Sequence, residues 1–119
     1  MNDQTTIGQA AAAGALPFAE AKKAGHLLFI SGQIGVETEF GQEVRHVMEN
    51  IGRVLQGHGL GYSHLVNVTI YLTDMASYGE MNKVYSEFFR DGFPTRVCIA
   101  VKELAMHAKI EISAIASLS

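Results

Sequence analysis

The chain has 119 residues, of which 48 % are apolar and 18 % are charged, and its formal net charge is −3 at neutral pH. These values fit one compact globular domain, and the scattered positions of the few Lys and Arg residues argue against a nucleic-acid-binding surface. The chain has one cysteine, no apolar run of about 20 residues and no signal-peptide pattern, so it excludes an intrachain disulfide and a membrane span and predicts a soluble cytoplasmic protein.

The first third of the chain is expected to contain a lead-in and two short strands. Residues 1–16 show no clear period and predict a loosely ordered start to a single domain. Residues 18–23 fit an edge strand, because their two lysines would discourage pairing with other chains. Residues 27–31 form an apolar run between Gly25 and Gly32 and predict a buried strand.

Two amphipathic helices are expected. Apolar residues from Val44 to Leu55 recur every three or four positions, with charged residues such as Glu43 between them, and this period predicts a helix over 41–57. The same spacing predicts a second helix over 77–90, which ends at the sequence "RDGFP".

Three further strands alternate apolar and other side chains, over residues 65–73, 95–101 and 109–116. The order of elements is typical of an α+β fold, in which two helices cover one face of the sheet. We assign one apolar set from each strand to the helix-covered face: Val66, Val68, Ile70 and Leu72; Val97, Ile99 and Val101; Ile110, Ile112, Ala114 and Ala116.

The other face of the predicted sheet is mixed in character. It is too apolar for an ordinary wet surface and too polar for a core, so we expect another subunit to cover it in a homo-oligomer. The residues assigned to this second face are Thr69, Tyr71, Arg96, Cys98, Glu111, Ser113 and Ile115.

Several motifs, in this order and at these separations, resemble the Rid family, also called the YjgF/YER057c/UK114 family. They are "FISGQIG", "VTIYLTDM", "MNKVYSEFF", "FPTRVCIAV" and "KIEISAIA". The resemblance covers roughly residues 17–118. It implies a chorismate-mutase-like α+β domain of the bacterial type, with a mixed sheet and two helices on one face. It also implies a homotrimer with a central β-barrel and with ligand clefts at the subunit interfaces.

The resemblance also implies an activity, because many family members hydrolyse reactive 2-imino acids or enamines to 2-oxo acids and ammonia. No metal or organic cofactor takes part in that reaction. We therefore expect an imine deaminase that acts on C=N bonds of small carboxylates, similar to a 2-iminobutanoate/2-iminopropanoate deaminase.

Arg96 is the first candidate site residue, because it matches the arginine of the family motif "P-x-R-x-C". A planar guanidinium suits a bidentate grip on a carboxylate, although the same group could serve a structural ion pair with Glu111. Cys98 follows two residues later, and the motif contains no histidine that could activate its thiol. The resemblance gives Cys98 another role, in which its backbone carbonyl contacts the ligand nitrogen or the attacking water.

Five further positions match the family's cleft or its catalytic acid. Glu111 could orient or partly deprotonate the water that attacks the C=N carbon, or simply neutralise Arg96 or Lys109. The other four matches are Ser31 and Gly32 in the "SGQ" turn, Asn82 on the second helix, and Phe18. Deaminase members usually have a tyrosine where this chain has Phe18, so one ring hydroxyl is missing here.

Other functions stay open from the sequence. The five histidines show no metal-ligand spacing, so no metal site is expected. The chain could be a non-enzymatic module that binds 2-oxo acids, or a deaminase for a different enamine such as an aminomuconate. An endoribonuclease or translation inhibitor is less compatible with the acidic balance of the chain.

Overall fold

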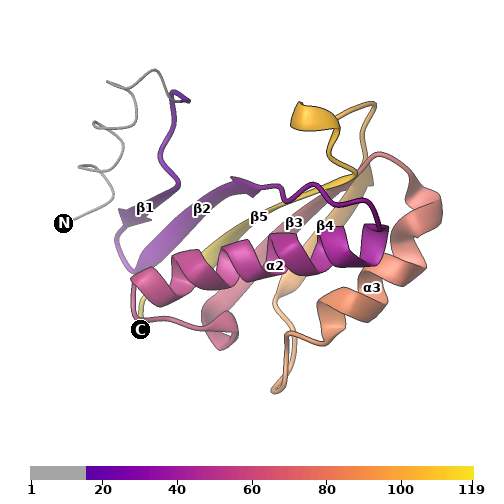
Figure 1. The fold of residues 1–119 in the computed structure, drawn as a ribbon. Coiled ribbons are helices and arrows are strands. Elements are labelled where there is room, and N and C mark those ends of the chain that lie inside the picture. Colours follow the sequence, from indigo (N-terminus) through magenta and orange to yellow (C-terminus); the bar gives the residue numbers. More distant parts are fainter. Residues whose placement is uncertain (1–15) are drawn as a thin grey trace.

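A five-stranded sheet with two helices on one face makes up the part of the chain that the computed structural model describes, residues 16–119 (Figure 1). In chain order the elements are β1 (Ala21–Ala24), β2 (Leu27–Gln33), α2 (Phe40–Gly57), β3 (Leu65–Leu72), α3 (Tyr78–Ser86), β4 (Thr95–Ala100) and β5 (Ile110–Ser117). Short 3-10 turns precede β3, α3 and β5, at Tyr62–His64, Met75–Ser77 and Ala105–His107. The predicted lead-in lies, except for Leu16, outside the described residues.

The sheet has the strand order β1-β2-β5-β3-β4. β4 is parallel to β3, and the other neighbours are antiparallel, so the sheet is mixed as expected. A tight hairpin joins β1 to β2 at Gly25, whose φ of +61° favours glycine. The two strands predicted before the first helix are therefore present, and the first begins at Ala21 rather than at residue 18.

The core lies between the helices and the sheet. Val44, Val47, Ile51 and Leu55 of α2 are almost completely buried, as their spacing predicts, and each such side chain contributes about 1.5–3 kcal/mol through burial. The sheet residues buried in the same core are Ala21, Leu28, Ile30, Leu65, Val68, Ile70, Leu72, Ile110, Ile112, Ala114 and Ala116. β5 therefore presents the face that its alternation predicts.

The second helix is shorter than the predicted range 77–90. The α-helix ends at Ser86, and the next residues continue as tight turns, in which the Phe88 and Phe89 amides donate to carbonyls three residues earlier. The apolar spacing of this segment therefore continues past the helix itself. Phe88 and Phe89 still pack against the core.

A bulge at the start of β3 changes one predicted side chain. The register between β3 and β5 shifts between Leu65 and Asn67, so that Leu65 is buried and Val66 is 42 % exposed. The assignment of Val66 to the helix-covered face was therefore wrong, since an extra residue in a strand reverses the alternation before it. From Val68 onward the predicted alternation is confirmed.

The two faces of β4 are reversed relative to the prediction. In the register between β3 and β4, Arg96 lies beside Val68 and Cys98 beside Ile70, so both share the face that the helices cover. Val97 and Ile99 lie on the other face and are 53 % and 43 % exposed. The alternation of this strand was read with the correct period and the wrong side.

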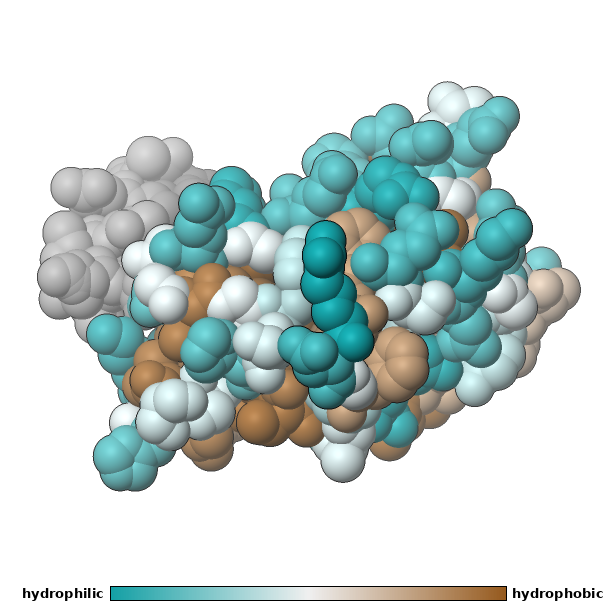
Figure 2. Space-filling model, turned by 90° about the horizontal axis from the view of Figure 1, so that it is seen from below, coloured by the Kyte–Doolittle hydropathy of each residue, from teal (hydrophilic) through white to brown (hydrophobic). Residues whose placement is uncertain are grey.

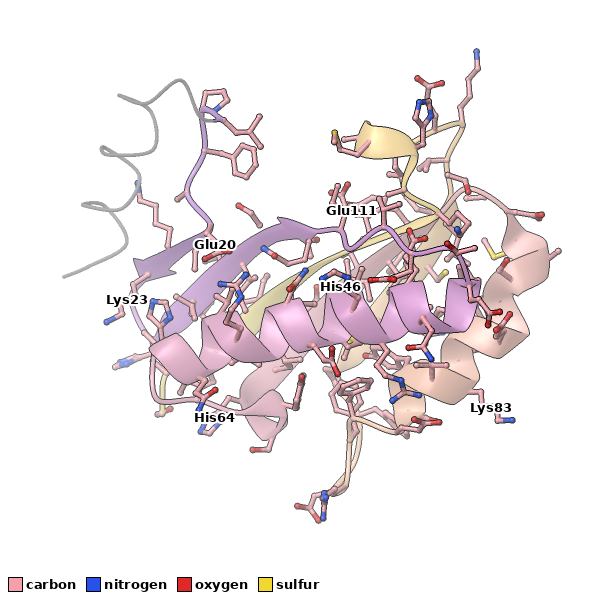
Figure 3. All side chains as sticks on the ribbon, in the orientation of Figure 1. Glu20, Lys23, His46, His64, Lys83 and Glu111 are labelled. Carbon is pink, nitrogen blue, oxygen red and sulfur yellow. The ribbon has the colours of Figure 1, made fainter. Side chains whose placement is uncertain are left out.

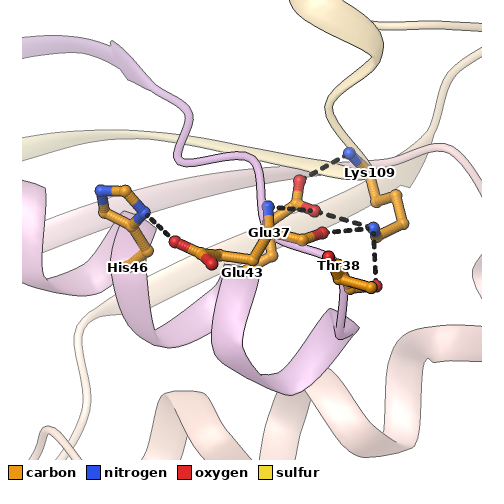
Figure 4. A network of polar contacts seen from close by, with 5 residues as sticks. All are labelled: Glu37, Thr38, Glu43, His46 and Lys109. Carbon is orange, nitrogen blue, oxygen red and sulfur yellow. Dashed lines mark hydrogen bonds and ion pairs between the residues drawn. The ribbon is translucent and has the colours of Figure 1, made fainter.

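A buried ion pair ties the start of α2 to the start of β5 (Figure 4). Glu43 was expected among the exposed charges of the helix, but its side chain is fully buried. It accepts hydrogen bonds from the Lys109 backbone N–H at 2.7 Å and from the Glu37 N–H at 3.4 Å, and it pairs with Lys109 Nζ at 3.1 Å. Lys109 Nζ also donates to the Glu37 carbonyl, and Glu37 pairs with His46.

The face of the sheet opposite the helices is open in a single chain. Phe29 of β2 is 44 % exposed on this face, beside half-buried Ile115 of β5. Val97 and Ile99 of β4 are exposed on the same face, at the far edge of the sheet. The surface seen from below in Figure 2 also carries hydrophobic side chains interspersed with hydrophilic ones. Among the described residues, no helix has the length and apolar character needed to cross a membrane.

Candidate functional site

Arg96 of β4 lies under one face of α3. Tyr78, Asn82 and Tyr85 fall at positions i, i+4 and i+7 of that helix, so their side chains share the face that meets β4. Arg96 Nη2 donates a hydrogen bond to Tyr78 Oη at 3.1 Å. The guanidinium carbon also lies 5.5 Å from the ring centre of Tyr78 and 5.1 Å from that of Tyr85, which is within the range of cation–π attraction.

No acid neutralises Arg96 within residues 16–119. The ion pairs of this region join other partners, such as Arg45 with Glu87 and Arg53 with Glu20. A structural ion pair with Glu111, the alternative that the sequence left open, is absent from the described part of the chain. A half-buried guanidinium without a counter-ion is available to bind an anion.

A pocket of about 320 Å³ opens beside this guanidinium. It is lined by Asn82, Tyr85, Ser86, Phe93, Pro94 and Arg96. Apart from the arginine and two small polar side chains, its walls are rings and proline. It can therefore receive a small molecule with a carboxylate at one end and an apolar group at the other.

Tyr85 forms the floor of this region and is 3 % exposed. Its ring packs on Phe89 at 4.8 Å and lies nearly parallel to Phe93 at 6.5 Å. Burial raises the pKa of the Tyr85 hydroxyl to about 12, although the charge of Arg96 opposes that shift. Tyr85 Oη and Asn82 Oδ1 are buried and have no hydrogen-bond partner, so two polar atoms beside Arg96 are unsatisfied.

Cys98 is half-buried on the same face as Arg96 and packs against the core. Burial raises the pKa of its thiol, and the nearby Arg96 charge lowers it by less. A raised pKa keeps the sulfur protonated at neutral pH, which is the opposite of what a cysteine nucleophile needs. This environment fits the expectation that the thiol itself does no chemistry.

Ser31, Gly32 and Glu111 form a second cluster, where β2 meets β5. The register between these strands shifts between Ile30 and Gln33, so that Ser31 and Gly32 lie in a bulge. A Cβ atom on Gly32 would lie 2.8 Å from Glu111 Cδ and 3.1 Å from Cγ, so any larger residue at this position would displace the glutamate side chain from its present place.

The segment that contains Phe18 reaches this second cluster. Ser31 Oγ donates to the Ala19 carbonyl, and the Ser31 N–H donates to the Glu20 carbonyl at 2.9 Å. Phe18 precedes Ala19 in the chain and is 51 % exposed. The candidate residues Phe18, Ser31, Gly32 and Glu111 therefore belong to one region.

The two clusters lie on opposite sides of the sheet. Glu111 pairs in register with Tyr71 and points to the open face, away from α2, as Figure 3 shows. Arg96 pairs with Val68 on the helix-covered face. The prediction that Arg96, Cys98 and Glu111 share one face was therefore wrong. It followed from assigning the wrong side to β4.

The structure also adds residues that the sequence reading did not assign to the site. Tyr78, Tyr85, Phe93 and Pro94 surround or border the Arg96 pocket. The spacing of Tyr78, Asn82 and Tyr85 on one helix is the signal that could have revealed them, had β4 been placed beside α3. No group of three or more His, Cys, Asp or Glu side chains in residues 16–119 is arranged to hold a metal ion.

These observations define a small α+β protein that presents an unpaired arginine at an aromatic pocket between a helix and an edge strand. The endoribonuclease L-PSP family model matches residues 8–118. The chain belongs to this family, which is the Rid (YjgF/YER057c/UK114) family suggested by its motifs.

Relatives of known sequence cover most of the chain. A RutC family protein of Pyrococcus horikoshii is 39 % identical over an alignment 108 positions long, which covers 84 % of this chain and 86 % of the relative. The human 2-iminobutanoate/2-iminopropanoate deaminase is 31 % identical over an alignment 119 positions long, which covers 92 % of this chain and 87 % of the human protein.

Solved structures share the fold. The yeast protein YEO7 superimposes with a TM-score of 0.83 at 33 % identity and covers 87 % of this chain and 88 % of its own. TdcF of E. coli, crystallised with bound serine, has a TM-score of 0.83 at 29 % identity and covers 87 % of this chain and 90 % of its own. The single-domain fold with a mixed five-stranded sheet and two helices is that of these Rid proteins.

Proposed function

We propose that this protein hydrolyses reactive 2-imino acids to 2-oxo acids and ammonia. The observation that supports this most directly is the Arg96 guanidinium, which borders a small pocket and has no acidic partner within residues 16–119. The human relative is named for the same activity on 2-iminobutanoate and 2-iminopropanoate. The substrate class is therefore a small carboxylate with a C=N bond at its second carbon.

In this proposal Arg96 binds the substrate carboxylate. Two parallel N–H···O bonds from a guanidinium fix both the position and the plane of a carboxylate. Because the C=N carbon is directly attached to that carboxylate, its position is then set as well. Holding reacting groups in place accounts for much of the acceleration available to an intrinsically easy hydrolysis.

Glu111 accepts the proton of the attacking water in the proposed reaction. The water oxygen bonds to the C=N carbon, and the C=N double bond becomes a single bond as its π electrons move to the nitrogen. The nitrogen then takes the proton that Glu111 accepted. The hydroxyl proton of this tetrahedral species then passes to the amino nitrogen, the C–N bond breaks as the C=O bond forms, and ammonia leaves the 2-oxo acid behind. The bulge at Ser31 and Gly32 lies next to the Glu111 side chain, and its backbone groups would help to hold the water.

Arg96 and Glu111 can act on one substrate only if they come from different chains, because they lie on opposite sides of the sheet in a single chain. A homotrimer, as the resemblance implies, would provide such a shared cleft. Two features support an assembly of this kind. The open face carries Phe29, Val97 and Ile99, and β4 ends the sheet with no further strand beside it among residues 16–119.

The test is to generate 2-iminopropanoate continuously with an amino-acid oxidase and to follow its loss with and without the protein, with semicarbazide as the trap for the remaining imine. Wild type should accelerate the loss. Arg96→Ala should lower kcat/KM by roughly 100-fold or more, since two charge-assisted hydrogen bonds disappear. Arg45→Ala is the matched control, because it removes an arginine that pairs with Glu87 instead.

Two results would contradict the proposal. One is wild-type protein that leaves the imine lifetime unchanged. The other is Arg96→Ala protein as active as the Arg45→Ala control. Saturable binding of 2-oxobutanoate without any turnover would instead identify the non-enzymatic binding module.

A further inference from the structure

We propose that Tyr78 is a positioning residue that fixes the Arg96 guanidinium for carboxylate binding. This inference rests on the proposed function for its consequence, but the contact itself is independent of any substrate. Tyr78 is the first residue of α3, and its hydroxyl is the one hydrogen-bond partner of the Arg96 side chain among the described residues.

Arg96 needs such a support because of where it is placed. It lies on β4, an edge strand of the sheet, and no carboxylate among residues 16–119 holds its guanidinium. Arginine has four rotatable side-chain bonds, so an unsupported guanidinium samples many orientations, and binding a carboxylate would then require ordering it. A guanidinium that is already held in one plane avoids that cost.

Two aromatic rings lie next to the guanidinium in the structure. The ring centres of Tyr78 and Tyr85 lie 5.5 and 5.1 Å from the Arg96 guanidinium carbon, and the Tyr78 hydroxyl accepts a hydrogen bond from Arg96 Nη2 at 3.1 Å. The hydrogen bond uses one of the five guanidinium N–H groups. The remaining donors are free of protein acceptors in the described region and can receive a carboxylate.

The two tyrosines have different additional roles. Tyr85 is 3 % exposed and packs on Phe89 and Phe93, so its replacement would disturb the core. Tyr78 is 42 % exposed, and its replacement leaves no buried cavity. Tyr78→Phe keeps the ring and removes the hydroxyl, whereas Tyr78→Leu removes both, so the two variants separate the hydrogen bond from the ring contact.

The first experiment observes Arg96 without any ligand. In the NMR spectrum of ¹⁵N-labelled protein, the Nε–Hε signal that disappears in Arg96→Lys is assigned to Arg96. Aromatic rings close to a guanidinium shift such a signal away from the usual arginine position. The signal should move toward that position in Tyr78→Leu. If it does not move, Tyr78 does not hold Arg96 and the inference is overturned.

The second experiment measures binding of 2-oxobutanoate by calorimetry and turnover of the imine. Tyr78→Phe should weaken binding and raise KM by roughly fivefold to tenfold while kcat changes less than twofold, because the lost bond affects bound substrate and transition state equally. In an Arg96→Lys background the same substitution should have no further effect. Equal losses in both backgrounds would show that Tyr78 does not act through Arg96.

The matched control is Tyr62→Phe, which also removes one phenolic hydrogen bond, to the Met48 carbonyl at 2.8 Å. It should lower stability slightly and leave the affinity for 2-oxobutanoate unchanged. The failures are distinguishable. If the Arg96 signal moves as expected in Tyr78→Leu but wild type does not turn over the imine, the proposed function is contradicted and the positioning role is kept. If wild type turns over the imine but Tyr78→Phe binds 2-oxobutanoate as tightly as wild type, only the positioning role is contradicted.

Discussion

Glu43→Gln tests the buried ion pair that joins α2 to β5. The substitution keeps the shape of the side chain and removes its charge. Glu43 is fully buried and has three partners: the Lys109 N–H, the Lys109 ammonium and the Glu37 N–H. The glutamine oxygen can still accept a hydrogen bond from one backbone N–H. Its amide NH2 group, however, would face the remaining N–H donors of Glu37 and Lys109 and could not accept from them.

The expected loss of stability follows from these contacts. Breaking a fully buried pair costs about 3–5 kcal/mol, because the remaining charge has no partner. Here Lys109 is 40 % exposed at its side chain and also donates to the Glu37 carbonyl, so its ammonium stays partly solvated and bonded. We therefore expect a loss of about 2–3 kcal/mol, which corresponds to a decrease in Tm of roughly 8–12 °C for a domain of this size.

The assay is urea unfolding at constant protein concentration, with thermal unfolding as a second measurement. Glu49→Gln is the control, since it makes the same change at an exposed position of the same helix and should stay within about 0.5 kcal/mol of wild type. If Glu43→Gln is as stable as this control, the carboxylate does not hold the two elements together, and our interpretation of the network in Figure 4 is wrong.

Three further predictions follow from the site and the open face. Gly32→Ala should change the unfolding free energy by less than about 1 kcal/mol and lower kcat, because the new methyl group displaces the flexible Glu111 side chain rather than the backbone; normal kcat would argue against a role for that carboxylate. Cys98→Ser should keep most of the activity. Because burial raises the pKa of the Cys98 thiol above its usual value of 9.0, alkylation of Cys98 should be slow at pH 7 and should accelerate only as the pH rises past 9.0. Fast alkylation at pH 7 would reveal a thiolate and contradict this reasoning. Ile99→Lys places a charge on the open face, 43 % exposed in one chain, and should reduce the mass seen by light scattering while the far-UV circular dichroism is kept; an unchanged mass would place the subunit contact elsewhere.

Local features were predictable from the sequence because they depend on spacing alone. The apolar residues of α2 recur with the helical period, and the helix occupies almost the predicted range. The alternation of β5 predicts the buried set from Ile110 to Ala116. The set of motifs from "FISGQIG" to "KIEISAIA" was sufficient to identify the family, because together they span nearly the whole chain and their order is specific.

The side to which each strand turns is a different kind of property. A period of two states that alternate residues share a face, and it does not state which face meets the helices. For β4 the decision comes from its register with β3 and from its place at the edge of the sheet. There the more apolar residues, Val97 and Ile99, face away from the helices of their own chain.

The tertiary structure alone decided the surroundings of the charged residues. Glu43 has the spacing of a surface charge, and only the approach of Lys109, 66 positions later in the chain, allows it to be buried. Arg96 was recognisable from its motif, but its two tyrosines come from a helix that reaches it through folding. Charges interact through space, so their partners depend on distances that the order of residues does not contain.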